Sequence, residues 1–271
     1  MPSPIPTSSQ PWGFGRGLPD SSAVTPEALL ASFADAADAA REAVGALTAS
    51  ARRGRTDRPG QYDLDVVADV AVLAVLHPTG VAVVSEESGR SGPPDAPITV
   101  VLDPVDGSTN CSRGIPYWAI SLCALDGEGP LCSLVRNQAT GSVTTAVRGA
   151  GATRDGEAIV PSTVKVVGDA VLDLAGLPTH HLGWKQFRAL GSAALALVDV
   201  AAGSIDGFVD SAGMHAPWDY LGGLLACTEA GASVVDADGR ELAVTDPDAR
   251  RQLLAASTPE LLAELRAAVA P

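Results

Sequence analysis

The chain has 271 residues, of which 46% are apolar and only 4% aromatic, and it carries a formal net charge of −14. This apolar fraction excludes global disorder, and the length fits one large domain or two small ones. The negative charge argues against nucleic acid as a partner, because phosphate contacts need lysine and arginine, and it is compatible with a protein that collects cations.

The four cysteines show neither C-x-x-C pairing nor zinc-ligand spacing to a histidine, which favours reduced thiols. The N-terminus lacks the basic and apolar regions of a signal peptide. No run approaches the ~20 apolar residues that a membrane span requires. We therefore expect a cytoplasmic protein with no membrane partner, in which residues 1–22 form a mobile N-terminal arm.

The first predicted elements are two helices and a set of strands. Thr25-Pro26-Glu27 supplies an N-cap hydroxyl, a proline at the first helical position and an acid in the first turn. A second helix is predicted from about Asp65 to His77, ended by Pro78 and Gly80. Apolar runs bounded by turn residues then predict buried strands over 81–85 and 98–102, followed by an antiparallel meander over 117–125, 131–135 and 142–148.

After Gly151 the pattern alternates between strands and helices. Strands are predicted at 170–174, 205–210, 233–235 and 253–256, and helices at 193–202, at 217–230 and from Pro259 onward. This change divides the chain into an α+β subdomain over residues 23–155 and an α/β subdomain over residues 156–271, which contributes Asp219.

The segment Val-Leu-Asp-Pro-Val-Asp-Gly-Ser-Thr-Asn, residues 101–110, carries the clearest chemistry. Asp103 and Asp106 follow a predicted strand, and the small residues after them could hold an anion with their amides. Hard oxygen ligands beside such a turn suit a magnesium-dependent phosphate site. The same letters also describe an Asp-Pro and Asp-Gly turn that merely closes a strand, so both interpretations stay open at this point.

Three further groups of acids give this segment a context. Glu86 and Glu87 end the strand predicted over 81–85, acids at 63, 65 and 69 lie near the start of the second helix, and Asp219 opens the helix at 217–230. Each group has an ordinary alternative: a solvated turn, a helix-start cluster, or an acid that complements a helix dipole. Their combination favours a shared metal site.

Three motifs resemble the signatures of the inositol monophosphatase family: Val84-Ser85-Glu86-Glu87-Ser88, Asp103-Pro104-Val105-Asp106-Gly107-Ser108-Thr109-Asn110 and Trp218-Asp219. That family comprises magnesium-dependent, lithium-sensitive phosphomonoesterases. The resemblance runs from roughly Thr25 to the C-terminus. It implies the layered α-β-α-β-α sandwich of the inositol monophosphatase and fructose-1,6-bisphosphatase type, and a homodimer, which the family commonly forms.

The resemblance also implies roles for individual residues. Glu86, Asp103 and the Val105 carbonyl would hold one Mg²⁺ ion, and Asp103, Asp106 and Asp219 a second, with a third, weaker ion near Glu86. Ser108 stands at the family's threonine position and would orient the attacking water with Asp63 as its hydrogen-bond partner. The predicted catalytic residues are therefore Asp63, Ser108 and Glu86, and the predicted phosphate and substrate contacts are Gly107, Ser108, Thr109, Gly191, Ala193 and Asp210.

Some positions depart from the family's pattern. Asp65 is an additional acid, which we expect to be dispensable for turnover. Asp210 is one methylene shorter than the usual glutamate, and the loop from Asp210 to Asp219 is longer and contains His215. These changes lie where the alcohol part of a substrate would bind.

The sequence therefore predicts a phosphomonoesterase that acts on a small phosphorylated metabolite. Inositol monophosphate and histidinol phosphate are the leading substrates, and a sugar phosphate of specialised metabolism is a third. The alternative from another class is a non-catalytic relative that binds metal or phosphoester and regulates a partner.

Overall fold

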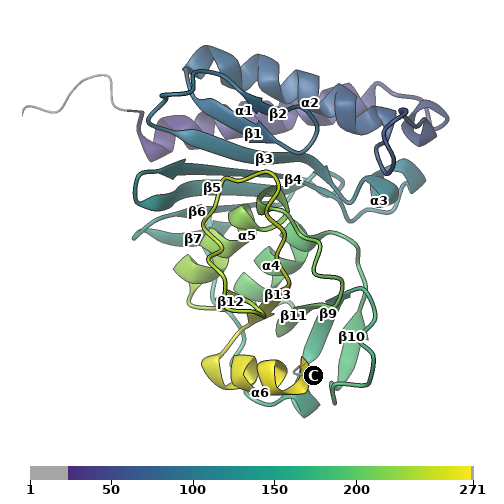
Figure 1. Ribbon diagram of the computed structural model, residues 1–271, viewed down its shortest axis with the longest axis vertical. Helices are drawn as coiled ribbons and strands as arrows, with labels where there is room; N and C mark the ends of the chain where they lie inside the picture. The colour runs from purple at the N-terminus through teal and green to yellow at the C-terminus, as the bar shows by residue number, and fades with distance from the viewer. Residues whose placement is uncertain (1–23, 270–271) are drawn as a thin grey trace, which may run out of the picture.

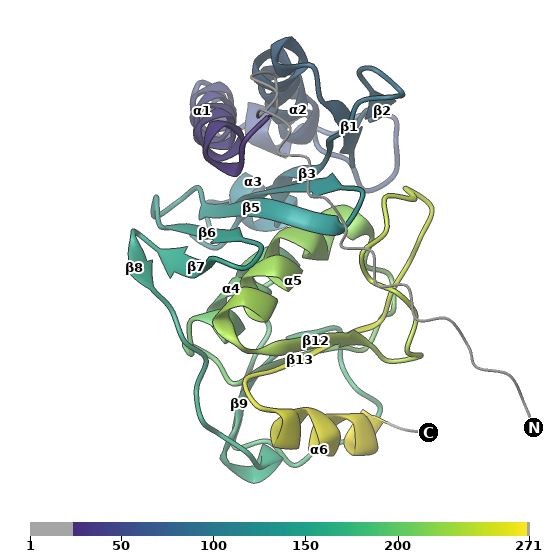
Figure 2. The same ribbon diagram turned by 90° about the vertical axis from the view of Figure 1, so that its left-hand side faces the viewer.

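The structure, a computed structural model, describes residues 24–269 and consists of alternating layers of helices and sheets (Figure 1). Helices α1 (Pro26–Gly45) and α2 (Asp63–Leu76) cover the outer face of an eight-stranded sheet. Helices α4 (Ala193–Ala201) and α5 (Pro217–Ala230) separate it from a five-stranded sheet, whose far face is covered by α6 (Pro259–Val269) (Figure 2). This order confirms the predicted α-β-α-β-α sandwich. The predicted N-terminal arm, residues 1–22, lies outside the described residues.

The larger sheet has the strand order β2-β1-β3-β4-β5-β6-β7-β8. Strand β1 is parallel to β3, and the other neighbours are antiparallel, which confirms the predicted meander. The bounds are β1 (Ala82–Ser85), β2 (Gly89–Ser91), β3 (Thr99–Asp106), β4 (Ala119–Asp126), β5 (Gly129–Asn137), β6 (Val143–Val147), β7 (Gly151–Arg154) and β8 (Glu157–Ala158), with the short helix α3 (Ser108–Arg113) after β3.

The smaller sheet has the order β10-β9-β11-β13-β12. Its strands are β9 (Val171–Ala175), β10 (Gln186–Arg188), β11 (Gly207–Asp210), β12 (Ser233–Asp236) and β13 (Leu253–Ala256). Short 3₁₀ turns occupy residues 51–53, 77–79 and 167–169. Among the helices of residues 24–269, none is both long and apolar enough to cross a membrane.

Helix α2 begins at Asp63, earlier than the predicted Asp65. Its N-cap residue, Tyr62, has no short polar side chain of the kind that usually marks a helix start. Instead the Asp65 carboxylate reaches back and accepts a hydrogen bond from the Tyr62 backbone N–H at 2.8 Å. The cap therefore comes from inside the helix, which is why the sequence pattern misplaced its first turn.

Strand β3 continues through both aspartates to Asp106, past the predicted end at residue 102. Residues three apart in a regular strand point to opposite faces. Here Asp103 pairs with Ser121 and Asp106 with Ala119, so one extra residue is accommodated in a bulge that contains Pro104, which has no N–H for the ladder. Because Ser121 and Ala119 are two apart, the bulge brings Asp103 and Asp106 to the same face.

The middle layer joins the two sheets into one core. One hydrophobic cluster contains α4 and α5 together with Val84 and Val101 of the larger sheet and Leu253 and Ala255 of the smaller. The predicted division after residue 155 falls just before β8, the last strand of the larger sheet, and the two sheets share a layer of helices. All four cysteines are buried free thiols, as the sequence predicts.

Glycines let α5 approach its neighbours closely. A Cβ atom on Gly222 would lie 2.8 Å from Ser121 Oγ, and one on Gly223 would lie 2.4 Å from Leu197 Cβ on α4. A methyl group at either position therefore requires the packed layers to separate.

We expect Gly223→Ala to destabilise the protein by about 1–3 kcal/mol, because the added methyl overpacks the contact between α4 and α5. Chemical denaturation would measure the loss. Gly45→Ala is the matched control: Gly45 ends α1 and has open space around the position of a Cβ, so alanine should be neutral or slightly stabilising. Equal stability of the two variants would contradict the packing argument.

Candidate active site

Strand and helix geometry brings three carboxylates together. Asp103 shares a strand face with Val101, and Glu86 follows Val84 by two positions, so both acids face the middle layer that contains these valines. Asp219 comes from that layer, at the N-terminus of α5, where its carboxylate accepts from the Ala216 N–H at 2.6 Å. Oxygen atoms of Glu86, Asp103 and Asp219 all lie within 4.8 Å of one another.

Burial and mutual repulsion raise the pKa of each of these acids. Burial, followed by the charges of Asp219 and Glu87, raises the pKa of Glu86 to about 8. Burial raises the pKa of Asp219 to about 7, partly offset by nearby His215. The pKa of Asp103 lies well above its ordinary value, again because of burial and then the charge of Glu86. The cluster is therefore a concentration of negative charge that a cation would stabilise.

Asp106 lies beside this cluster at the N-terminus of α4. Its Oδ2 atom accepts from Ser192 Oγ and from the Ala194 N–H, both at 2.7 Å. Burial raises its pKa, and these hydrogen bonds oppose that rise. Glu87, in contrast, bonds to Gln61 and lies 3.6 Å from Arg58, which agrees with its interpretation as a neighbour of the ligands.

The two loops next to the carboxylates are tied to each other. Asn110 Nδ2 donates to the carbonyl of Leu190 and to that of Tyr117, both at 2.7 Å. Gly107 has φ +94°, and a Cβ there would lie 3.1 Å from the Gly191 carbonyl oxygen, so only glycine fits. The segments at 107–110 and 190–194, predicted to contact phosphate and substrate, thus form one wall of the site.

These residues fit a divalent metal ion. Carboxylate oxygens are the ligands that Mg²⁺ prefers. Three carboxylates meet here, with that of Asp106 beside them, and none of the four forms an ion pair with lysine or arginine among the described residues. Asp103 is held in place by its Oδ1 atom, which accepts a hydrogen bond from the Val105 N–H at 2.8 Å. Of the predicted ligands, Glu86, Asp103 and Asp219 converge, and Asp106 lies beside them.

The predicted hydrogen bond between Ser108 and Asp63 is not formed within the described residues. Asp63 is exposed at the first position of α2, and its carboxylate lies against Gly54. Ser108 Oγ instead donates to the Val105 carbonyl at 2.9 Å. The acid close to Ser108 is Asp65, which the helix turns inward and whose Oδ1 is buried without a hydrogen-bond partner in the described part of the chain.

Burial raises the pKa of Asp65 to about 6, and the nearby Ser108 hydroxyl opposes this rise. Two positions along a helix separate side chains by more than half a turn, which is why Asp65 faces inward and Asp63 outward. Two departures from the family pattern, the additional acid Asp65 and the serine at position 108, could have indicated this contact. The sequence does not give the direction in which either side chain points.

Thr109, also predicted as a contact, is exposed and bonds to the Tyr62 hydroxyl at 3.1 Å.

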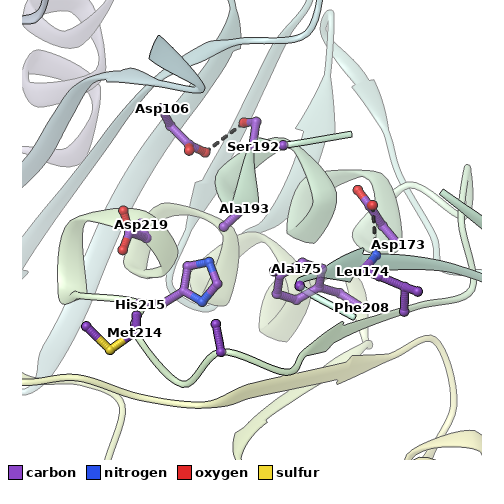
Figure 3. A pocket seen from close by; sticks show the side chains of 13 residues that line it. Asp106, Asp173, Leu174, Ala175, Ser192, Ala193, Phe208, Met214, His215 and Asp219 are labelled. Carbon is purple, nitrogen blue, oxygen red and sulfur yellow. Dashed lines mark hydrogen bonds between the residues drawn. The ribbon is translucent and has the colours of Figure 1, made fainter. Parts of the chain in front are cut away.

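A cavity of about 380 Å³ opens beside the carboxylates (Figure 3). Asp106 and Asp219 line it together with Gly191 and Ala193, two of the predicted substrate contacts. Asp210 is fully buried behind the cavity, where it accepts from the N–H groups of Ala212 and Gly213 and from His215 Nδ1 at 2.9 Å. Asp210, predicted to contact substrate, therefore does not line the cavity, whereas His215 presents its ring to it.

The fold and the carboxylate cluster together are those of a metal-dependent phosphatase. The chain belongs to the inositol monophosphatase family, whose sequence model matches residues 30–270. A fructose-1,6-bisphosphatase/inositol-1-monophosphatase of Thermococcus kodakarensis is 37% identical over 188 residues, which cover 67% of this chain and 71% of the relative.

Other relatives carry different names. An inositol-1-monophosphatase of Mesorhizobium japonicum is 36% identical and aligns over 67% of this chain and 74% of its own length. The Nus factor SuhB of Escherichia coli is 33% identical over 58% of this chain and 63% of its own. Among solved structures, an extragenic suppressor from Pyrococcus furiosus superposes with a TM-score of 0.78 at 26% identity, covering 88% of this chain and 99% of that one.

The position of Asp65 leads to a prediction opposite to the one from sequence. Asp65→Asn should lower kcat by about 10- to 100-fold with little change in KM, because Ser108 loses the acid that can accept its proton. The asparagine oxygen still caps Tyr62, so the fold should persist. Steady-state kinetics would measure the effect, with exposed Asp63→Asn as control; loss of activity in the control alone would restore the original assignment.

Proposed function

We propose that this protein is a Mg²⁺-dependent phosphomonoesterase of small phosphorylated alcohols. The observation that carries the proposal is the convergence of Glu86, Asp103 and Asp219, with Asp106 beside them, at the edge of a cavity of about 380 Å³. A cavity of this size suits a small metabolite. The chemistry of the site favours a phosphate ester over other small ligands, because carboxylate-bound Mg²⁺ commonly engages phosphate oxygens.

Each residue has a defined part in this proposal. Glu86, Asp103, Asp106, Asp219 and the Val105 carbonyl would hold Mg²⁺, which polarises phosphoryl oxygens and makes bound water more acidic. Ser108, with Asp65 behind it, would orient the attacking water, and its hydroxyl would accept a proton from that water while passing its own proton to Asp65. The amides of residues 107–109 hold the phosphate, and Gly191, Ala193 and His215 contact the alcohol part.

Names of relatives support a small alcohol as the substrate. The Thermococcus kodakarensis relative is named a fructose-1,6-bisphosphatase/inositol-1-monophosphatase, and the Mesorhizobium japonicum relative an inositol-1-monophosphatase. The cavity of the present chain has apolar walls from Leu174, Phe208 and Met214 beside its polar groups. Inositol monophosphate and histidinol phosphate remain the leading substrates, with a sugar phosphate as the third.

The test is a panel of phosphate esters, beginning with a generic aryl phosphate, with Mg²⁺ and with a chelator. We expect turnover that requires Mg²⁺ and that the chelator abolishes. Absence of Mg²⁺-dependent release of phosphate from every ester in the panel would remove the enzyme proposal.

The second candidate function is regulatory binding of a partner protein. The relative named Nus factor SuhB favours this function. So does the hydrogen bond from the Ser108 hydroxyl to the Val105 carbonyl, because the hydroxyl is the group proposed to orient water and the carbonyl is a proposed metal ligand. Stabilisation of the protein against heat by Mg²⁺, without turnover of any ester, would favour this function.

A homodimer and a cytoplasmic location also remain proposals. Size-exclusion chromatography with light scattering would measure the oligomeric state.

A further inference from the structure

A buried carboxylate outside the metal cluster, that of Asp173 in β9, lines the same cavity. Only 1% of this residue is exposed. Figure 3 shows Asp173 at one end of the cavity and Asp106 and Asp219 at the other, with His215 next to Asp219. The mechanism proposed above gives Asp173 no part.

The hydrogen bonds of Asp173 leave one oxygen free. Oδ1 accepts from the Leu174 N–H at 2.8 Å and from the Leu190 N–H at 3.1 Å. Within residues 24–269, Oδ2 has no hydrogen bond, and no basic side chain forms an ion pair with Asp173. Arg188, the nearby cation, is exposed and donates to the Phe187 carbonyl and to Gln186.

This arrangement is costly without a ligand. Burial raises the pKa of Asp173, and the charge of Asp199 adds to the rise, while two backbone hydrogen bonds and nearby Arg188 oppose it, so the charged form is disfavoured when no cation is bound. Apolar side chains of Leu174 and Phe208 surround that end of the cavity and keep the local dielectric low. A positively charged ligand group would remove the cost and would be held more strongly there than in water.

The two ends of the cavity therefore differ in charge preference. At the Asp106 end, the Mg²⁺ that the carboxylates would hold and the ring of His215 suit a phosphate. At the other end Asp173 suits a cation. A molecule with a phosphate at one end and a protonated nitrogen at the other matches both.

We propose that Asp173 binds a cationic nitrogen on the alcohol part of the substrate, so that the preferred substrates are phosphorylated amino alcohols. This proposal rests on the phosphatase function proposed above and narrows its substrate class. Asp173 acts as a specificity determinant through its charge, while its contacts with the two backbone N–H groups hold the loop before Gly191.

The test uses pairs of esters that differ only in an ammonium or a methyl group at the end of the chain. The pairs are 2-aminoethyl and propyl, 3-aminopropyl and butyl, and 4-aminobutyl and pentyl phosphates, so that the spacing between charge and phosphate varies. We expect kcat/KM of the wild-type protein to favour the aminoalkyl ester by about tenfold or more in at least one pair. Because this measurement needs no variant, it stands even if a substitution impairs folding.

Asp173→Asn should reduce the preference to within about twofold and leave the neutral esters within about threefold of wild type. The asparagine oxygen still accepts from Leu174 and Leu190, so only the charge is removed. Asp169→Asn, at an exposed position outside the cavity, is the control and should keep the full preference. Equal use of the paired esters by the wild-type protein, or a preference that survives in Asp173→Asn, would overturn the proposal while the phosphatase function stands.

If no ester is hydrolysed with Mg²⁺, the same pairs are compared by calorimetric binding with Ca²⁺ present. Tighter binding of the aminoalkyl ester that disappears in Asp173→Asn would support the Asp173 site although the phosphatase function fails. Equal binding of both members of every pair would overturn the Asp173 proposal as well.

Discussion

Asp103→Asn is expected to abolish Mg²⁺-dependent turnover and, at the same time, to make the metal-free protein more stable. Oxygens of Asp103, Glu86 and Asp219 lie within 4.8 Å of one another, so the substitution removes the charge of one of three converging ligands. We expect kcat to fall by about 10³-fold or more, because water activation and stabilisation of the phosphoryl group both depend on the ion.

The gain in stability follows from the removal of a repulsive charge. The asparagine has the size of the aspartate, and its oxygen still accepts from the Val105 N–H, so packing is retained. Thermal unfolding with a chelator should show a higher Tm than wild type, and added Mg²⁺ should raise this Tm less. Asp126→Asn, in a partly exposed ion pair with Arg148 on the same sheet, is the control and should leave turnover unchanged. Activity of Asp103→Asn within tenfold of wild type would refute the ligand assignment.

The metal-free protein is expected to lose stability as the pH rises from about 4 to about 8. The pKa values of Asp219 and Glu86 are raised to about 7 and about 8 in the folded state, whereas the unfolded chain titrates near 3.8 and 4.5. The folded state therefore binds more protons, and the stability from these acids is fully present below pH 4 and lost as pH passes through the folded pKa values. The loss should be on the order of a few kcal/mol.

Denaturant unfolding at pH 5 and pH 8, with chelator and with Mg²⁺, would measure this effect. Mg²⁺ should restore stability at pH 8, where the carboxylates are charged, and have little effect at pH 5. The raised pKa of His215 acts in the same direction, while the pKa of Asp236, lowered to about 2 by Arg240 against the effect of burial, affects only more acidic solutions. Metal-free stability that stays constant or increases over this range would contradict the prediction.

The sequence predicted those parts of the fold whose side chains carry a regular pattern. Helix α5 and strand β13 have the predicted bounds, because proline and glycine bracket the first and a continuous apolar run defines the second. Strands β2, β8 and β10 were not predicted, since they are short and largely polar or exposed and lack an apolar pattern.

The metal ligands could be predicted from motifs, because the residue type at each motif position is enough to identify a carboxylate ligand. Side-chain direction could not be inferred, and this accounts for the corrections at Asp63 and Asp210. Asp65, and not Asp63, lies near Ser108, because the turn of helix α2 directs Asp65 inward. His215, and not Asp210, lines the cavity, because the loop places the His215 ring next to the buried Asp210 carboxylate. The hydrogen bond from Ser192 to Asp106 was not predicted, because these residues are 86 positions apart and the sequence does not show which distant segments come into contact.

The bulge in β3 has a consequence for how this chain can vary. Asp103 and Asp106, three positions apart, share a face only because one residue between them has no pairing partner on β4. Deleting Pro104 would place the two aspartates two positions apart, which keeps them on one face of a regular strand. One added residue between them would instead turn Asp106 toward α2 and away from Ser192. This stretch of β3 can therefore lose its bulged residue without separating the two acids, whereas lengthening it by one residue would separate them.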